Sequence, residues 1–178
     1  MMQILKKIFV PNSESKIDEM VSNVNNEDFI SLFKLDLENL SLSDFESAYS
    51  EVLKNGDIIF NYAQKLPYRE CKIFDNIKLK ITATDYVNVT LSCSQPESLS
   101  SNTIKTFIDS LYSIYGPDCY NKQGFSKSDE EDFNDVDLFP FFGRNWLDYP
   151  KYKYPISLRR SMTDLSLSIW GIKYIENA

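Results

Sequence analysis

Six carboxylates lie within nine residues in the C-terminal half of the chain. Oxygen ligands at this density are the kind that Ca²⁺ and Mg²⁺ prefer, so a divalent-metal site is one hypothesis. The segment has no glycine for the sharp turn of an EF-hand loop and no bidentate Glu at the required distance. We therefore expect no metal cofactor, which leaves a solvated acidic loop or a surface for a basic partner protein. The carboxylates are Asp129, Glu130, Glu131, Asp132, Asp135 and Asp137.

An aromatic-rich stretch follows directly, with seven rings within sixteen residues. Prolines at positions 140, 150 and 155 argue against a helix or a central strand, which predicts a long loop. One interpretation is that the rings cover one end of the core, because each aromatic side chain buries a large area. The other is an exposed aromatic patch that acts as a protein–protein hot spot. The rings are Phe139, Phe141, Phe142, Trp146, Tyr149, Tyr152 and Tyr154.

The chain contains no histidine, which removes the commonest general base at neutral pH and the commonest ligand of transition metals. It also lacks the glycine patterns of phosphate-binding loops and of nucleophile elbows. Cys71, Cys93 and Cys119 form no CxxC pair, which predicts reduced thiols rather than a disulfide framework or a zinc site. An enzyme would have to rely on carboxylates, Tyr, Lys or Cys, so we expect a non-enzymatic protein.

The formal net charge is −7, which argues against a general affinity for nucleic acid or for anionic membranes. A local basic patch is still compatible with that total. The chain after Asp137 is itself net basic, so the acidity is concentrated in one segment. No signal peptide and no apolar run long enough to cross a bilayer is recognisable, which predicts a cytoplasmic protein.

Helical signals dominate the N-terminal part of the sequence. Apolar residues recur at helical spacing over 17–24. Ser43 and Glu46 form a capping box, and Gly56 supplies a stop, so the sequence predicts a second helix between them. Further helical turns are expected over 57–66.

The pattern then changes to the period of two that strands show. The pair Asp75-Asn76 predicts a hairpin turn, and a second turn is expected over 84–86. Residues 154–160 and 164–172 are expected to form a terminal hairpin. Polar residues alternate with apolar ones, so one face of the sheet is expected to be wet and the other buried.

Between these hairpins the sequence predicts one long helix over about 102–115, which ends at Gly116-Pro117. Separate runs of helices and of hairpins predict an α+β fold, with N-terminal helices, an antiparallel sheet built from hairpins, and the long helix packed on one face. We expect one domain over 1–178, with a mainly helical part over 1–66 and a β-β-α-β-β part over 67–178.

In general character the chain is similar to bacterial toxin-neutralising immunity proteins and to phage-encoded inhibitors, although no motif carries this similarity. We expect a non-enzymatic acidic domain of that inhibitor or immunity type. Its partner is expected to be another protein, a basic one, and neither nucleic acid nor a membrane. The binding residues would be the six carboxylates together with Phe139, Phe141, Phe142, Trp146, Tyr149 and Tyr152. The alternatives are a divalent-metal-dependent hydrolase that uses Asp129, Asp132, Asp135 and Asp137, and a structural or adaptor subunit.

Overall fold

A computed structural model describes residues 9–11, 26–33, 47–54, 58–65, 73–82, 86–135, 142–147, 152 and 154–174. The helix expected over 17–24 lies outside these residues. So do Cys71 and the binding candidates Asp137, Phe139, Phe141 and Tyr149.

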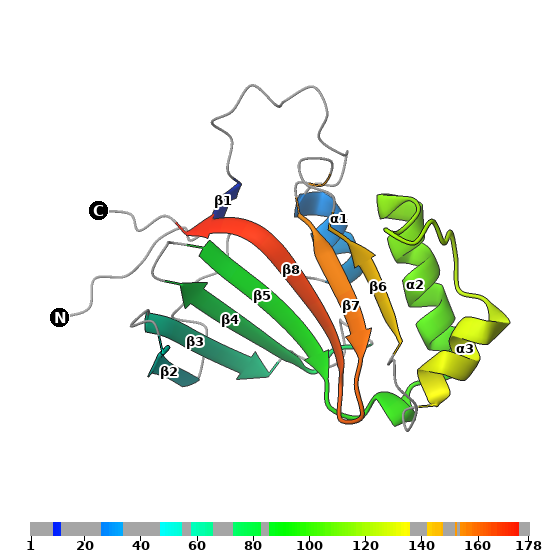
Figure 1. Ribbon diagram of the computed structural model, residues 1–178, viewed down its shortest axis with the longest axis horizontal. Helices are drawn as coiled ribbons and strands as arrows, with labels where there is room; N and C mark the ends of the chain where they lie inside the picture. The colour runs from blue at the N-terminus through cyan, green and yellow to red at the C-terminus, as the bar shows by residue number, and fades with distance from the viewer. Residues whose placement is uncertain are drawn as a thin grey trace.

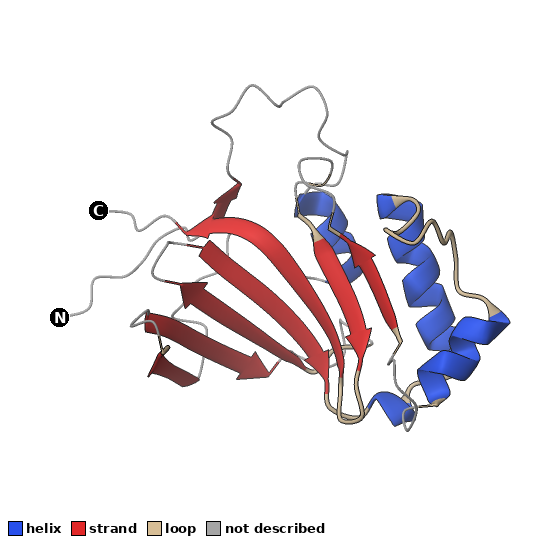
Figure 2. Ribbon diagram, in the orientation of Figure 1, coloured by secondary structure: helices blue, strands red, loops and turns tan. Residues whose placement is uncertain are grey.

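The described strands form one antiparallel sheet (Figures 1 and 2). The strands are β1 (Phe9–Pro11), β2 (Ser47–Val52), β3 (Ile58–Lys65), β4 (Asn76–Thr82), β5 (Tyr86–Cys93), β6 (Gly143–Trp146), β7 (Ile156–Arg160) and β8 (Leu165–Tyr174). Their order is β2-β3-β4-β5-β8-β7-β6, and β1 pairs with the C-terminal end of β8. Two sets of consecutive hairpins therefore meet where β5 pairs with β8.

The helices are α1 (Asn26–Phe33), the short 3₁₀ helix η2 (Pro96–Ser98), α2 (Ser101–Tyr115) and α3 (Lys127–Asn134). Helices α2 and α3 lie beside the β6 end of the sheet (Figure 1). The segment of α2 matches the long helix expected over 102–115. Its first turn is capped by Ser100, whose hydroxyl accepts a hydrogen bond from the backbone N–H of Thr103 at 3.2 Å.

The core lies between one face of the sheet and α2. Alternate residues of β4, β5, β7 and β8 point inward because successive side chains of a strand face opposite sides. Aromatic rings join the two layers: Phe107 meets Phe74 edge-on at 5.5 Å, and Tyr112 meets Trp146 at 5.1 Å. The strand residues in this core are Ile77, Leu79, Val89, Leu91, Cys93, Trp146, Ile156, Leu158, Leu165, Leu167 and Ile169.

The fold is α+β with an antiparallel sheet built from hairpins, but two of the predicted N-terminal helices are wrong. Strand β2 occupies most of the segment with the capping box, and β3 occupies the segment expected to hold further helical turns. Aromatic and β-branched residues are abundant in β3, and pairing across the sheet outweighs local capping signals. The described residues up to position 66 are therefore mainly β, with α1 as their one helix.

The predicted turn at Asp75-Asn76 is also wrong, because β4 begins at Asn76. Instead, the backbone N–H of Asp75 donates to Ser92 at 2.9 Å, and its carboxylate accepts from the Ser94 N–H at 3.1 Å. Asp75 thus ties the start of β4 to the end of β5. The two other hairpins match the prediction, since β4 pairs with β5 and β7 pairs with β8.

Gly116 ends α2 with a φ of 73° and a ψ of −159°, a conformation that residues with a side chain rarely adopt. We expect Gly116→Ala to lower the free energy of unfolding by about 1–3 kcal/mol, although open space surrounds the added methyl group. Urea denaturation measures the loss. Gly124→Ala is the matched control, because its Cβ would make an ordinary 3.5 Å contact with Asp109. Equal losses for both variants would show that the conformation of Gly116 is not the cause.

Candidate functional site

The acidic segment is a helix rather than a loop, because most of it forms α3. The Ser126 hydroxyl accepts a hydrogen bond from the Asp129 N–H at 3.3 Å, and the Asp129 carboxylate accepts from the Ser126 N–H at 2.8 Å. This reciprocal pair is a capping box. The expectation of a solvated loop was wrong here, and the signal that would have predicted the helix is Ser126 three residues before Asp129.

Asp129 is buried, with 1% of its surface exposed, so its carboxylate is not accessible to another protein. Its carboxylate accepts hydrogen bonds from the Lys122 ammonium at 2.6 Å and from the Arg144 guanidinium, in addition to those from Ser126. Burial by itself raises the pKa of Asp129, but these donors outweigh it and hold the pKa well below its usual range. Asp129 is therefore an anionic anchor between α3 and β6.

A second buried carboxylate, Asp118, organises the connection between α2 and α3. It accepts hydrogen bonds from the backbone N–H groups of Tyr120 and Lys122, each at 2.9 Å, and from the Tyr112 hydroxyl at 3.2 Å. Burial raises the pKa of Tyr112, so its hydroxyl stays protonated and donates. The Arg144 Nε lies 3.7 Å from Asp118, so this guanidinium links both buried carboxylates.

The described aromatic residues of the predicted patch belong to the core. Phe142, Trp146 and Tyr152 are each 3% exposed or less, so they are not available as exposed anchors. The Tyr152 hydroxyl donates to the Tyr115 carbonyl at 3.0 Å, and the Arg144 guanidinium lies 4.4 Å from the centre of the Phe142 ring. The rings of this stretch thus hold β6 and α2 together, which is the first of the two interpretations.

The remaining described carboxylates of α3 point outward. Glu131, Asp132 and Asp135 are exposed and Glu130 is half-buried, and we call these four residues the acidic ridge. The last turn of α3 contains no basic residue. Negative charge near a helix C-terminus is unfavourable, because the carbonyl ends of the peptide dipoles lie there. Asp132 and Asp135, at that end, therefore lower the stability of α3, whereas Glu130 lies in the first turn, where negative charge is favourable.

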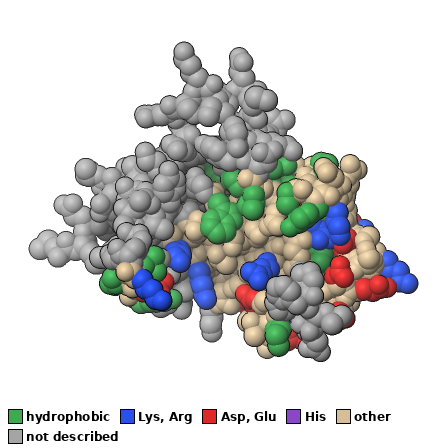
Figure 3. Space-filling model, in the orientation of Figure 1, with side chains coloured by type: hydrophobic (Ala, Val, Ile, Leu, Met, Phe, Trp, Pro, Cys, Tyr) green, Lys and Arg blue, Asp and Glu red, His purple; other side chains and the backbone are tan. Residues whose placement is uncertain are grey.

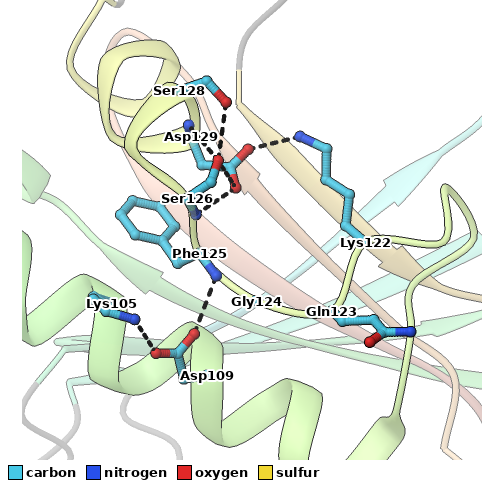
Figure 4. Close-up of a pocket in the computed structure, with 9 residues that line it drawn as sticks. All are labelled: Lys105, Asp109, Lys122, Gln123, Gly124, Phe125, Ser126, Ser128 and Asp129. Carbon is cyan, nitrogen blue, oxygen red and sulfur yellow. Dashed lines mark hydrogen bonds and ion pairs between the residues drawn. The ribbon is translucent and has the colours of Figure 1, made fainter.

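A pocket of about 450 Å³ lies between α2, the α2–α3 connection and the first turn of α3 (Figure 4). Its two ammonium groups already have partners: Lys105 pairs with Asp109 at 2.5 Å, and Lys122 pairs with Asp129. The Phe125 N–H donates to Asp109 at 3.1 Å. Because its charges balance, the pocket has no net charge that would select an anion or a cation.

The described residues were also candidates for a metal site, a reactive thiol and a membrane-spanning helix. No three of their His, Cys, Asp or Glu side chains are grouped to hold a metal ion. Cys93 is buried in β5, where burial raises the pKa of its thiol, and Cys119 is an exposed free thiol. No helix among the described residues is both long and apolar enough to cross a bilayer.

Comparison of the chain with protein-family models, with curated proteins and with solved structures finds no match. The functional residues are therefore inferred from the chain's own geometry, in which the buried anchor positions the acidic ridge.

We expect Asp129→Asn to lower the free energy of unfolding by about 3 kcal/mol at pH 7, because Arg144 and Lys122 lose the carboxylate that they share and Arg144 keeps only the more distant Asp118 as a counter-charge. The folded-state pKa of Asp129 lies below its unfolded value, so its stabilising effect is present above about pH 4 and is lost as the pH falls further. The deficit of the variant should therefore shrink below pH 4. Urea denaturation at pH 7, 5 and 3 measures it.

Asp132→Asn is the control for this variant, because Asp132 is an exposed residue of the same helix. Its effect should stay within about 0.5 kcal/mol at each pH. A comparable loss in both variants would contradict the role of Asp129 as an anchor.

Proposed function

We propose that the protein is a non-enzymatic binding protein of inhibitor or immunity type, and that the acidic ridge of α3 engages a basic partner protein. The observation that supports this proposal most directly is the fixed position of the ridge. Asp129 fastens the first turn of α3 to Arg144, while Glu131 and Asp132 remain exposed on the same helix and Asp135 is exposed at its C-terminal cap. Carboxylates on a rigid helix bind a basic surface with less loss of conformational entropy than carboxylates on a mobile loop.

The proposal places the protein in the cytoplasm and assigns it no catalytic group. The Asp129 carboxylate is occupied by Arg144, Lys122 and Ser126, and none of the described carboxylates has a histidine or a grouped metal ligand as a partner. Inhibition by occlusion of another enzyme needs complementary charge and shape but no catalysis. Among the described residues, Tyr120 is an exposed ring on the α2–α3 connection and is a candidate aromatic anchor.

Capture from cells of the source organism tests the ridge. We expect the double variant Glu131→Gln with Asp132→Asn to retain a basic partner about tenfold less well than the unaltered chain, because it loses two charges that steer and hold that partner. Glu51→Gln with Glu97→Gln is the matched control, since it removes two exposed carboxylates outside α3. Equal retention by the two double variants would show that the ridge does not bind the partner.

Thermal melts with and without millimolar Ca²⁺, Mg²⁺ or Mn²⁺ separate this function from that of a metal-dependent hydrolase. We expect no change in Tm, because three side chains already occupy the Asp129 carboxylate. A specific ion would raise Tm by mass action. Such a rise, lost in Asp132→Asn, would favour the hydrolase and count against a purely binding role.

A further inference from the structure

The sheet has a second face, which points away from the core and is lined by polar side chains. We define the open sheet face by the outward residues of β4 to β8. One row crosses five strands, because the register places Lys78, Thr90, Ser168, Ser157 and Asn145 next to one another. The Thr90 and Ser168 hydroxyls lie 3.5 Å apart, and Ser157 donates to Asn145 at 2.6 Å. Hydroxyl and amide groups thus form a surface that can donate and accept hydrogen bonds.

Charge is segregated onto this face. The described strands contain a single acidic residue, Glu51 on the edge strand β2, although the chain has 26. The open sheet face itself carries Lys78, Lys80 and Arg159, and none of its five strands contains an Asp or a Glu. Figure 3 shows Lys and Arg side chains spaced apart on the viewed side of the molecule, with apolar side chains between them. This is a local basic patch on an acidic protein, and it is complementary to a polyanion.

An exposed tryptophan lies on the same face. Trp170 is 40% exposed, whereas Trp146, the other tryptophan of the chain, is 1% exposed. The register slips beside Trp170, because Val87 opposes Ile172 while Val89 opposes Ile169. Two residues of β8, Trp170 and Gly171, therefore oppose Asn88, which is a β-bulge. Bulges of this kind re-aim a side chain and are frequent next to binding sites.

The distances between these groups suit a polymer rather than a small molecule. Lys80 pairs with Asn88, and Asn88 opposes the bulge, so Lys80 and Trp170 stand two strands apart, about 10 Å. Leu147 is also exposed, and it follows Gly143 and Asn145 as the next outward position after β6. It therefore lies toward the end of the face where Trp170 stands. A flat aromatic ring therefore lies beside amide and hydroxyl groups, with Lys80 about 10 Å away and Lys78 and Arg159 farther along the strands.

We propose that the open sheet face binds single-stranded nucleic acid, with a base stacked on Trp170 and the phosphates near Lys78, Lys80 and Arg159. Single strands present unstacked bases to aromatic side chains, and antiparallel sheets serve as platforms for this contact. Asn88 next to the ring has the amide groups needed to contact a base edge. Duplexes hide the faces of their bases and offer Trp170 nothing to stack on. This proposal goes beyond the binding function of α3 and uses a different surface.

Tryptophan fluorescence tests the proposal. The 178-residue chain is titrated at low salt with an oligo(dT) of about 12 nucleotides. A second titration uses the same strand in a duplex. We expect the single strand to quench the emission of Trp170 and the duplex to leave it unchanged. Because three cations face the phosphates, the log–log dependence of affinity on salt should have a slope of about −2. Trp170→Phe should remove the quenched component while Trp146 still emits.

Charge variants locate the contact. Lys78→Glu with Lys80→Glu should weaken binding of the oligonucleotide at least tenfold, and Lys105→Glu with Lys127→Glu should weaken it far less. Both double variants change the net charge equally, so the difference between them isolates the open sheet face. Circular dichroism checks that each variant is folded.

Three outcomes would overturn the proposal: no quenching by the single strand, equal weakening by the two double variants, or equal quenching when the duplex or heparin is titrated in place of the single strand. Equal quenching by heparin would mean that the face binds polyanions without reading bases. Because the ridge residues Glu131 and Asp132 are unchanged in all these variants, such a failure would leave the function proposed for α3 untouched.

Discussion

The ion pair between Asp129 and Arg144 determines where α3 lies. This helix buries only two side chains, Asp129 and Phe133, so its apolar contact with the core is a single ring, which packs edge-on against Phe142. Burying either charge alone would cost several kcal/mol, and together they satisfy one another with help from Ser126 and Lys122. Arg144 also lies near Asp118, which orders the preceding connection. One guanidinium therefore fixes a helix, a connection and a strand relative to the core.

A net charge of −7 conceals two surfaces of opposite sign. Carboxylates are concentrated on α3 and the connecting segments, whereas the strands contain Glu51 alone. Each surface repels the ligand proposed for the other: the ridge disfavours phosphates, and the lysines of the sheet disfavour a basic protein. Like-charge repulsion of this kind gives specificity as well as solubility. Two different ligands on one small domain are therefore physically compatible.

The parts of the fold that the sequence predicted are those determined by neighbouring residues. Alternation of apolar and polar residues predicts the strands of the β4–β5 and β7–β8 hairpins. Apolar residues at helical spacing, followed by Gly116, predict α2. Strand β2 was missed because Tyr49 and Val52 fit a helical stripe as well as a strand, and only the pairing with β3 decides between them. The burial of Asp129 was missed because its partner Arg144 is fifteen residues away along the chain. The patterns also leave open whether Trp146 or Trp170 faces solvent.

The two tryptophans show why the open sheet face needs a functional explanation. Trp146 occupies the core, where its ring packs on Tyr112 and its indole N–H donates to the Gly116 carbonyl at 2.9 Å. Trp170 stands in a row of polar residues, and its partial exposure forgoes about 1 kcal/mol or more of hydrophobic stabilisation. A serine or threonine, as elsewhere on this face, would suit a merely solvated sheet better. The bulge aims the ring outward, the ring offers a face on which a base can stack, and cations without neighbouring carboxylates attract the phosphates of the same ligand.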